Sequence, residues 1–147
     1  MNKNETLYWS ISGEKNSVIS FILSSEVSNK KIEGFDWVDA VVKIHTACFW
    51  ANVNLTITLS DIISFLEQIK NMSKNLKGVA RFSTIEDQIN FLLEINRLGQ
   101  INISGYLRES MSGRNELNFE ITSDQTFLEK SILEINNLLS QLNIKTI

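Results

Sequence analysis

Apolar residues recur at every second position over most of this chain, and that alternation limits the folds open to it. In the stretch NELNFEITSDQTFLEK, residues 115–130, Leu117, Phe119 and Ile121 alternate with polar residues. A period of two is typical of a strand with one buried and one exposed face, because successive side chains of a strand point to opposite sides. The stretch therefore predicts a strand whose apolar side chains face a core.

Two segments carry the spacing of a helix instead. Thr122 is followed three positions later by Gln125, a capping-box spacing, just before a helical apolar series. An earlier segment, residues 58–77, has apolar residues at spacings of three and four, and Asp61 lies three positions after Thr58. We expect two helices, with N-caps at Thr58 and Thr122.

The remaining alternation predicts a mainly antiparallel sheet of about seven or eight strands. The expected strands cover residues 7–12, 17–27, 37–44, 49–57, 79–84, 89–95, 101–107 and 116–121. The apolar phase switches around Thr46 and Ala47, which indicates a turn there. Regular alternation of apolar and polar residues favours a sheet with one buried and one solvent-exposed face. We therefore predict an α+β fold in a single domain, residues 1–147, with the two helices packed on one face of the sheet.

Composition and length fit one globular domain in a reducing compartment. The chain has 147 residues, of which 43% are hydrophobic and 21% charged. Its first ten residues lack the apolar core of a signal peptide, and the longest apolar run, residues 18–23, is too short to cross a membrane. The single cysteine, Cys48, cannot form an internal disulfide. We expect a cytoplasmic protein that is not inserted in a membrane.

The charge balance argues against nucleic acid as a partner. The chain carries 14 basic and 17 acidic residues, a formal net charge of −3. Nucleic-acid binders usually cluster Lys and Arg, because phosphate contacts dominate their affinity. Here residues 33–42 and 115–129 hold acidic residues and no basic ones. Two interpretations stay open: an ordinary solvated surface, or an acidic patch for a basic partner.

The sequence contains no recognisable catalytic, cofactor-binding or metal-binding pattern. His45 is the only histidine, and with Cys48 it offers at most two metal ligands. The apolar context TACFW favours a buried thiol for Cys48 over a reactive one. No serine lies in a G-x-S-x-G elbow, and the glycines are too scattered for a phosphate-binding loop. We predict that the chain is not an enzyme and needs no cofactor.

Five residues are candidates for partner binding. Trp50 and Tyr106 fall on the polar phase of their strands, as do Glu94, Glu116 and Glu120. If the helices cover one face of the sheet, these side chains share the other. A wet sheet face with aromatic and acidic residues is suited to protein binding. The alternative is an ordinary solvent-exposed face.

Four stretches of the chain resemble the WapI-like immunity proteins. They are FDWVDAVVKI, FWANVNLTITLSDIISFLEQIKNMSKNLKGVARFST, GQINISGYL and NELNFEITSDQTFLEK. The resemblance runs from about residue 37 to residue 139. Its most specific parts are the Leu-x-Phe-x-Ile strand before Asp124-Gln125-Thr126 and the Leu-x-Gly-x-Ala-x-Phe pattern at residues 76–82. It implies a small cytoplasmic antidote, encoded beside a large wall-associated or contact-delivered bacterial toxin, with no catalytic residues.

Two classes of function therefore remain, with an uncharacterised enzyme ranked third. The favoured hypothesis is an immunity protein of a polymorphic, contact-dependent toxin system, which binds the C-terminal domain of one cognate toxin at its active site or an adjacent exosite. The alternative is a non-catalytic adaptor, or a module that carries a small apolar ligand between sheet and helices. The discriminating observation is the adjacent reading frame: a large secreted protein with a variable C-terminal domain, encoded just upstream, would favour the immunity hypothesis.

Overall fold

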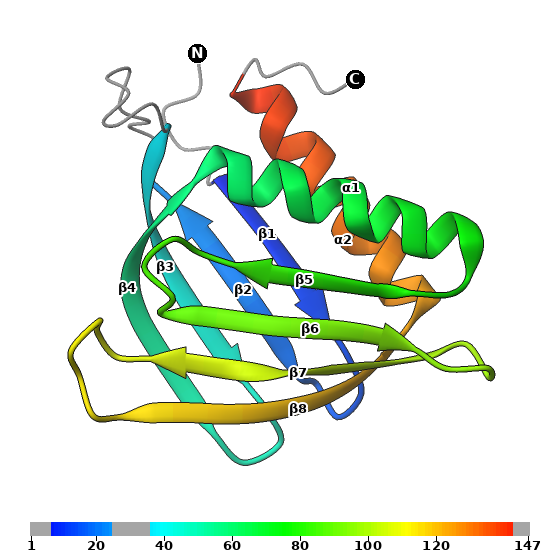
Figure 1. The fold of residues 1–147 in the computed structure, drawn as a ribbon, viewed down its shortest axis with the longest axis horizontal. Helices are drawn as coiled ribbons and strands as arrows, with labels where there is room; N and C mark the ends of the chain where they lie inside the picture. Colours follow the sequence, from blue (N-terminus) through cyan, green and yellow to red (C-terminus); the bar gives the residue numbers. More distant parts are fainter. Residues whose placement is uncertain (1–6, 25–35, 143–147) are drawn as a thin grey trace.

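The computed structural model of the protein describes residues 7–24 and 36–142, which form eight strands and two helices (Figure 1). The strands are β1 (Leu7–Ser12), β2 (Val18–Leu23), β3 (Trp37–His45), β4 (Trp50–Thr58), β5 (Val79–Ser83), β6 (Ile89–Ile95), β7 (Gln100–Arg108) and β8 (Glu116–Asp124). The helices are α1 (Leu59–Asn75) and α2 (Gln125–Gln141). The predicted α+β class is confirmed, and so is the turn near Thr46 and Ala47.

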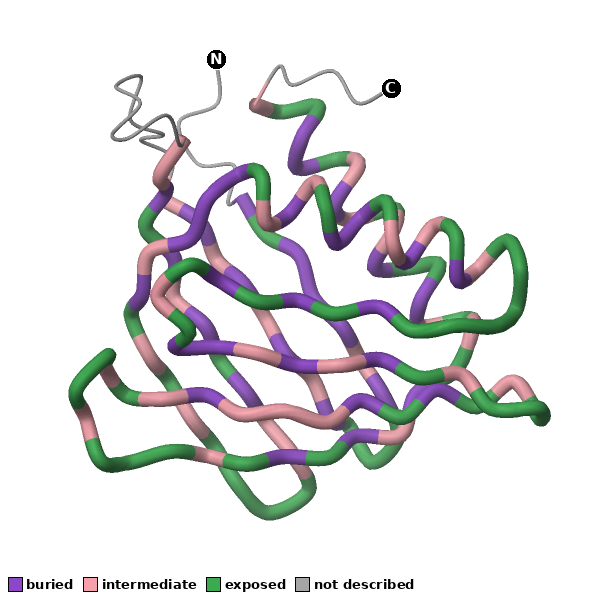
Figure 2. The backbone as a smooth tube through the Cα atoms, viewed as in Figure 1, coloured by how far each residue is buried: buried purple, intermediate pink, exposed green. Residues whose placement is uncertain are grey.

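The strands form two antiparallel sheets, and in this the arrangement differs from the single sheet expected. Their orders are β1-β2-β3-β4 and β5-β6-β7-β8, so within each sheet consecutive strands of the chain pair with each other. The division falls at α1, which carries the chain from the last strand of the first sheet to the first strand of the second. The buried side chains of both sheets form one core, and buried positions alternate along the strands (Figure 2).

A cluster of aromatic rings, the ring cluster, joins both sheets to α1. Trp9 and Phe21 of the first sheet stack with ring centroids 4.1 Å apart, and Phe82 and Phe91 of the second sheet stack at 5.4 Å. Phe21 meets Phe82 edge-on at 5.0 Å, and Phe65 of α1 lies 5.6 Å from Trp9 and 5.5 Å from Phe82. Each such pair adds about 0.5–1.5 kcal/mol beyond the burial of its surface. The ring cluster therefore fixes the two sheets and α1 as one unit.

The helices lie along the outermost strands β1 and β5 rather than over one face of a continuous sheet (Figure 1). On β1, the Ser10 N–H donates to Glu134 Oε1 at 3.2 Å, and Ser131 Oγ of α2 donates to the Ser10 carbonyl at 2.6 Å. On β5, the Arg81 N–H donates to Gln68 Oε1 at 2.9 Å, and Gln68 Nε2 of α1 donates to the Arg81 carbonyl at 3.2 Å. Side chains of the helices thus satisfy main-chain groups at two sheet edges, which otherwise invite pairing with another chain.

The start of α1 follows the sequence prediction, whereas the start of α2 does not. Thr58 and Asp61 form the predicted capping box, with the Asp61 N–H 3.1 Å from Thr58 Oγ1 and the Thr58 N–H 3.0 Å from Asp61 Oδ2. In α2 the N-cap is Asp124, whose Oδ1 accepts from the Phe127 N–H at 3.1 Å. The prediction of Thr122 as N-cap is wrong because β8 continues in register with β7 to Asp124.

The burial of Phe119 generates a stability prediction. Phe119 lies on the inner face of β8 with 7% of its surface exposed, whereas Phe49, in the turn after β3, is 63% exposed. We expect Phe119→Ala to lower the free energy of unfolding by about 3–5 kcal/mol, the usual range for a buried Phe. The matched control Phe49→Ala should change it by less than about 0.5 kcal/mol. Urea denaturation measures both, and equal losses would contradict the assignment of Phe119 to the core.

Candidate functional site

The five candidate residues lie on two different sheets. Trp50 starts β4 on the outer face of the first sheet, whereas Glu94, Tyr106, Glu116 and Glu120 lie on the outer face of the second sheet. The expectation that all five share one face is therefore wrong. The physical reason is the division of the strands at α1, because each of the two sheets has its own outer face.

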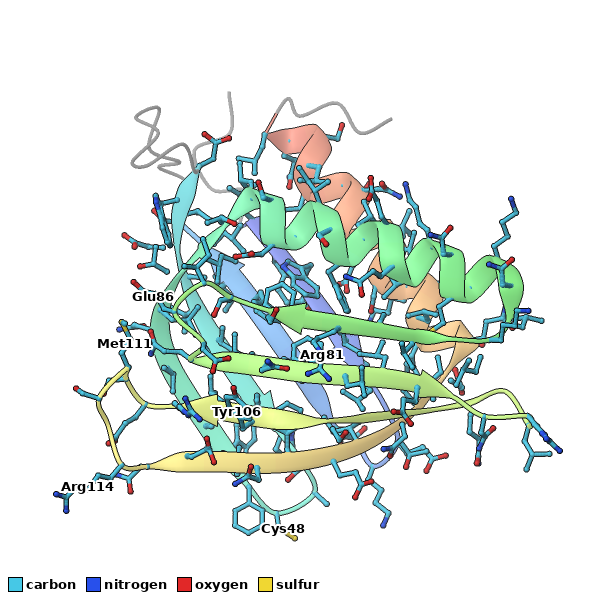
Figure 3. All side chains as sticks on the ribbon, in the orientation of Figure 1. Cys48, Arg81, Glu86, Tyr106, Met111 and Arg114 are labelled. Atoms are coloured by element: carbon cyan, nitrogen blue, oxygen red, sulfur yellow. The ribbon has the colours of Figure 1, made fainter. Side chains whose placement is uncertain are left out.

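Tyr106 and Glu116 belong to a connected polar cluster, which we call the Tyr106 network. Tyr106 lies on β7 (Figure 3). Its hydroxyl donates to Asp87 Oδ1 at 2.7 Å, and the Arg108 guanidinium carbon lies 4.6 Å from the centre of its ring. Arg108 Nε donates to Glu116 Oε1 at 2.8 Å, and Asn118 Nδ2 donates to Glu116 Oε2 at 3.3 Å. These contacts hold the side chains of Tyr106 and Glu116 in fixed positions relative to their neighbours.

The same contacts set the protonation states of the Tyr106 network. The hydrogen bond from Arg108 lowers the pKa of the Glu116 carboxyl below its ordinary value. The hydrogen bond to Asp87 raises the pKa of the Tyr106 hydroxyl, and the bond to Glu116 raises the pKa of Arg108. At neutral pH the surface therefore presents an ionised Glu116, a charged Arg108 and a neutral Tyr106 hydroxyl.

Glu94 and Glu120 lie outside this network. In the strand register Glu94 is opposite Asn102 and Glu120 is opposite Ser104, and neither carboxylate bonds or pairs with another described side chain. Glu120 borders a shallow depression of about 310 Å³ between the β1–β2 turn, the β3–β4 turn and β8, and Phe49 lines the same depression. Glu120 is thus the candidate on the second sheet that approaches the turn preceding Trp50.

The β3–β4 turn carries the most prominent exposed aromatic pair. The turn is closed by the Thr46 N–H, which donates to the Phe49 carbonyl at 3.0 Å. Phe49 is 63% exposed and Trp50 is 77% exposed, and the His45 ring stacks on Trp50 at 3.8 Å. Cys48 lies exposed at the tip of this turn (Figure 3), so the expectation of a buried thiol is wrong. Its apolar neighbours belong to a turn, where strand alternation no longer directs them inward.

Three residues that contact or adjoin the candidates were not predicted from the sequence: Phe49 beside Trp50, and Arg108 and Asp87 in the Tyr106 network. Phe49 falls on the apolar phase of its strand, and only its place in the turn signals that it is exposed. Arg108 and Glu116 flank the β7–β8 turn as a directly opposed cross-strand pair, a relation that requires the hairpin register. Asp87 joins the Tyr106 network from the β5–β6 turn, where it adopts φ 55°. No periodicity of the sequence marks that position.

The described residues show neither a metal-binding cluster nor a membrane-spanning helix. Within residues 7–24 and 36–142, no group of three or more His, Cys, Asp and Glu side chains is arranged to hold a metal ion. No helix in the described part of the chain has the length and apolar character needed to cross a membrane.

The family of the chain follows from comparison with known families. The model of the Immunity protein WapI-like family matches residues 11–143, and the chain belongs to this family. The match starts earlier than the resemblance in sequence, which begins near residue 37, so it takes in β2 and the end of β1. No curated protein and no solved structure matches the chain. Family membership indicates an immunity protein, whose partner in general is a protein toxin.

The Arg108–Glu116 pair generates a prediction about pH. A lowered pKa means that ionised Glu116 stabilises the folded state at neutral pH, and that this contribution is lost as the pH falls below about 4. Arg108→Gln removes the donor, so we expect the Glu116 pKa to rise toward its ordinary value. Lys43→Gln on the outer face of the first sheet is the control and should leave it unchanged. Side-chain NMR titration measures both, and an unmoved Glu116 pKa in Arg108→Gln would contradict the pairing.

Proposed function

We propose that this chain protects the cell that makes it, in the cytoplasm, by direct contact with the C-terminal domain of one cognate bacterial toxin. The observation that carries the proposal is the family match over residues 11–143. The match indicates an immunity role, and an exposed surface with aromatic anchors and preorganised polar groups supports binding as its mechanism. Binding that covers the toxin active site or an adjacent exosite blocks the toxin without any catalysis by this chain.

Trp50 is the strongest candidate for an anchor. Large aromatic side chains dominate the energy of protein interfaces, and a 77% exposed Trp beside a 63% exposed Phe49 has no role in the core. Tyr106 is the second anchor, since its ring and hydroxyl are already oriented by Arg108 and Asp87. Of the four candidates on the second sheet, Glu120 is the one that lines the depression next to the β3–β4 turn, so a partner that covers Trp50 also reaches Glu120.

The acidic residues favour a partner with a basic surface. The chain has a formal net charge of −3, and Glu94, Glu116 and Glu120 present carboxylates on one outer face. Complementary charge speeds association and adds specificity more than it adds affinity. Toxins that attack nucleic acids bind phosphates with basic clefts, so this surface suits a toxin of that kind.

The alternative of a small-ligand carrier finds less support in the interior. The space between the sheets and α1 is filled by the ring cluster, whose members pack against each other at centroid distances of 4.1–6.4 Å. A ligand cavity needs open volume with a few orienting polar groups. Because the ring cluster fills the space between the sheets and α1, binding through the outer surface is favoured over an internal ligand site. A toxin-binding protein uses its outer surface, whereas a carrier needs an internal cavity.

Co-expression with the toxin tests the proposal. The probe is the separately produced C-terminal domain of a large secreted toxin, chosen by locating such a gene beside the gene for this chain. We expect this chain to restore growth of cells that express that domain, and to bind it with slow release, at a Kd approaching the non-covalent limit of about 10⁻¹³ M. An unrelated toxin domain is the control and should kill despite this chain. Lack of both protection and direct binding to the cognate domain would contradict the proposal.

Single substitutions extend the same test to the contact surface. Trp50→Ala should mainly hasten dissociation, because an anchor controls release, whereas Glu120→Gln should slow association and weaken its dependence on salt. Leu133→Ala is the matched control for Trp50→Ala, since Leu133 is a 61% exposed apolar residue on α2, outside the proposed surface. Surface plasmon resonance at two salt concentrations measures both rates. Unchanged rates for Trp50→Ala, Glu120→Gln and the corresponding Tyr106, Glu94 and Glu116 variants would place the contact elsewhere.

A further inference from the structure

The two sheets have four outermost strands, and these edges are protected to different degrees. β1 and β4 bound the first sheet, and β5 and β8 bound the second. The outer side of each such strand carries main-chain N–H and C=O groups that no neighbouring strand of the same sheet pairs. Proteins usually cover such edges, or place charges on them, because they otherwise accept another strand.

Three of the four edges have protection. The β1 and β5 edges bond to α2 and α1 through Ser10 and Arg81. On β8 the Thr122 carbonyl accepts from the Glu14 N–H at 2.8 Å, where the β1–β2 turn crosses the strand. The approach is close enough that a side chain at Gly13 would collide with the Thr122 carbonyl oxygen. The rest of β8 carries the carboxylates of its outer face, which discourage pairing.

The strand β4 has none of these protections. Its sequence, WANVNLTIT, contains no charged residue and no proline, and it pairs with β3 along all nine residues without a bulge. Charges, prolines and bulges are the usual devices that block an edge. A regular, uncharged, nine-residue edge therefore stands out against the other three.

Two hydrogen bonds at the ends of the β3–β4 ladder show which β4 groups point outward. The Thr46 N–H donates to the Phe49 carbonyl at 3.0 Å, and the Leu59 N–H donates to the Asp36 carbonyl at 3.1 Å. In an antiparallel pair, bonded residues alternate with residues whose main chain points away. Odd-numbered β4 residues therefore pair with β3. The outward groups belong to four residues, which we call the β4 edge: Trp50, Asn52, Asn54 and Thr56.

No described residue bonds to the N–H or C=O groups of the β4 edge, and an apolar seam lies beside it. The seam consists of Ala51 and Val53, which are half-buried on the inner face of β4. The helices lie mainly along β1 and β5, whereas β4 and β8 are the outermost strands at the other margins of the two sheets (Figure 1). A strand added at the β4 edge would place alternate side chains on this seam and the others beside Asn52 and Asn54.

We infer that the β4 edge accepts an extended segment of the toxin as a fifth strand of the first sheet. The inference rests on the proposed function and names how the toxin is held. The segment has apolar residues at alternate positions, which cover the seam, and belongs to a toxin domain with a net positive charge. The occupant is the toxin rather than a second copy of this chain, because two copies with a net charge of −3 repel each other, whereas a positively charged domain is attracted.

A proline substitution tests the main-chain bonds. Asn54→Pro removes an outward N–H that the β3–β4 ladder does not use, so the fold should tolerate it. We expect it to weaken toxin binding by about tenfold or more, because the added strand loses main-chain bonds at its centre. The matched control is Ser83→Pro, which removes an outward N–H from the β5 edge, outside the proposed contact. It should leave the affinity unchanged, and thermal unfolding checks that both variants fold.

Amide exchange in the wild-type complex gives a second readout that needs no variant. We expect the amides of Asn52, Asn54 and Thr56 to exchange fast in the free chain and to become protected when the toxin domain binds. If the toxin binds but these amides still exchange fast, the inference fails while the proposed function stands. If the toxin does not bind at all, the proposed function fails. Protection without toxin, with a doubled mass by light scattering, would assign the edge to a second copy and overturn the inference.

Discussion

The architecture depends on how the open edges of its two sheets are satisfied. Gln68 of α1 uses both ends of its amide on the main chain of Arg81, so one side chain replaces a missing strand neighbour at the β5 edge. Ser131 and Glu134 of α2 do the same for Ser10 at the β1 edge. These bonds orient the helices along the two edges, and the apolar faces of the helices then close the core from that side.

The consequence for function is an asymmetric molecule. The helices cover the β1 and β5 edges, and the ring cluster packs the two sheets together, so these contacts stabilise the fold. The other margins, with β4 and β8, keep an uncharged edge, a half-buried apolar seam and the exposed aromatic residues Phe49 and Trp50. A protein that blocks its partner by binding needs a rigid structure and a surface with main-chain and apolar groups that folding leaves without contacts. The partner then supplies those contacts. The described part of the chain supplies a packed core and a β4 edge whose outward main-chain groups have no partner.

The elements were predictable from sequence, whereas their assembly was not. Strand periodicity is local, so the eight strands and the outward phase of Tyr106 follow from residue order alone. The choice between Thr122 and Asp124 as N-cap is not local, because both are good caps and the pairing of β8 with β7 decides between them. Likewise, the alternation of apolar residues does not show that Trp50 lies on a different sheet from Tyr106. That follows from α1, which connects the last strand of the first sheet to the first strand of the second. The position of Asp87 depends on the conformation of the β5–β6 turn.

Native-state amide exchange of the free chain tests most directly whether the helices close two edges and leave one open. After correction for intrinsic rates, the Ser10 and Arg81 amides should exchange at least about tenfold more slowly than those of Asn52 and Asn54, although all four point outward from edge strands. The difference arises because only the first two donate to helix side chains. Equal rates at the four amides would contradict the account.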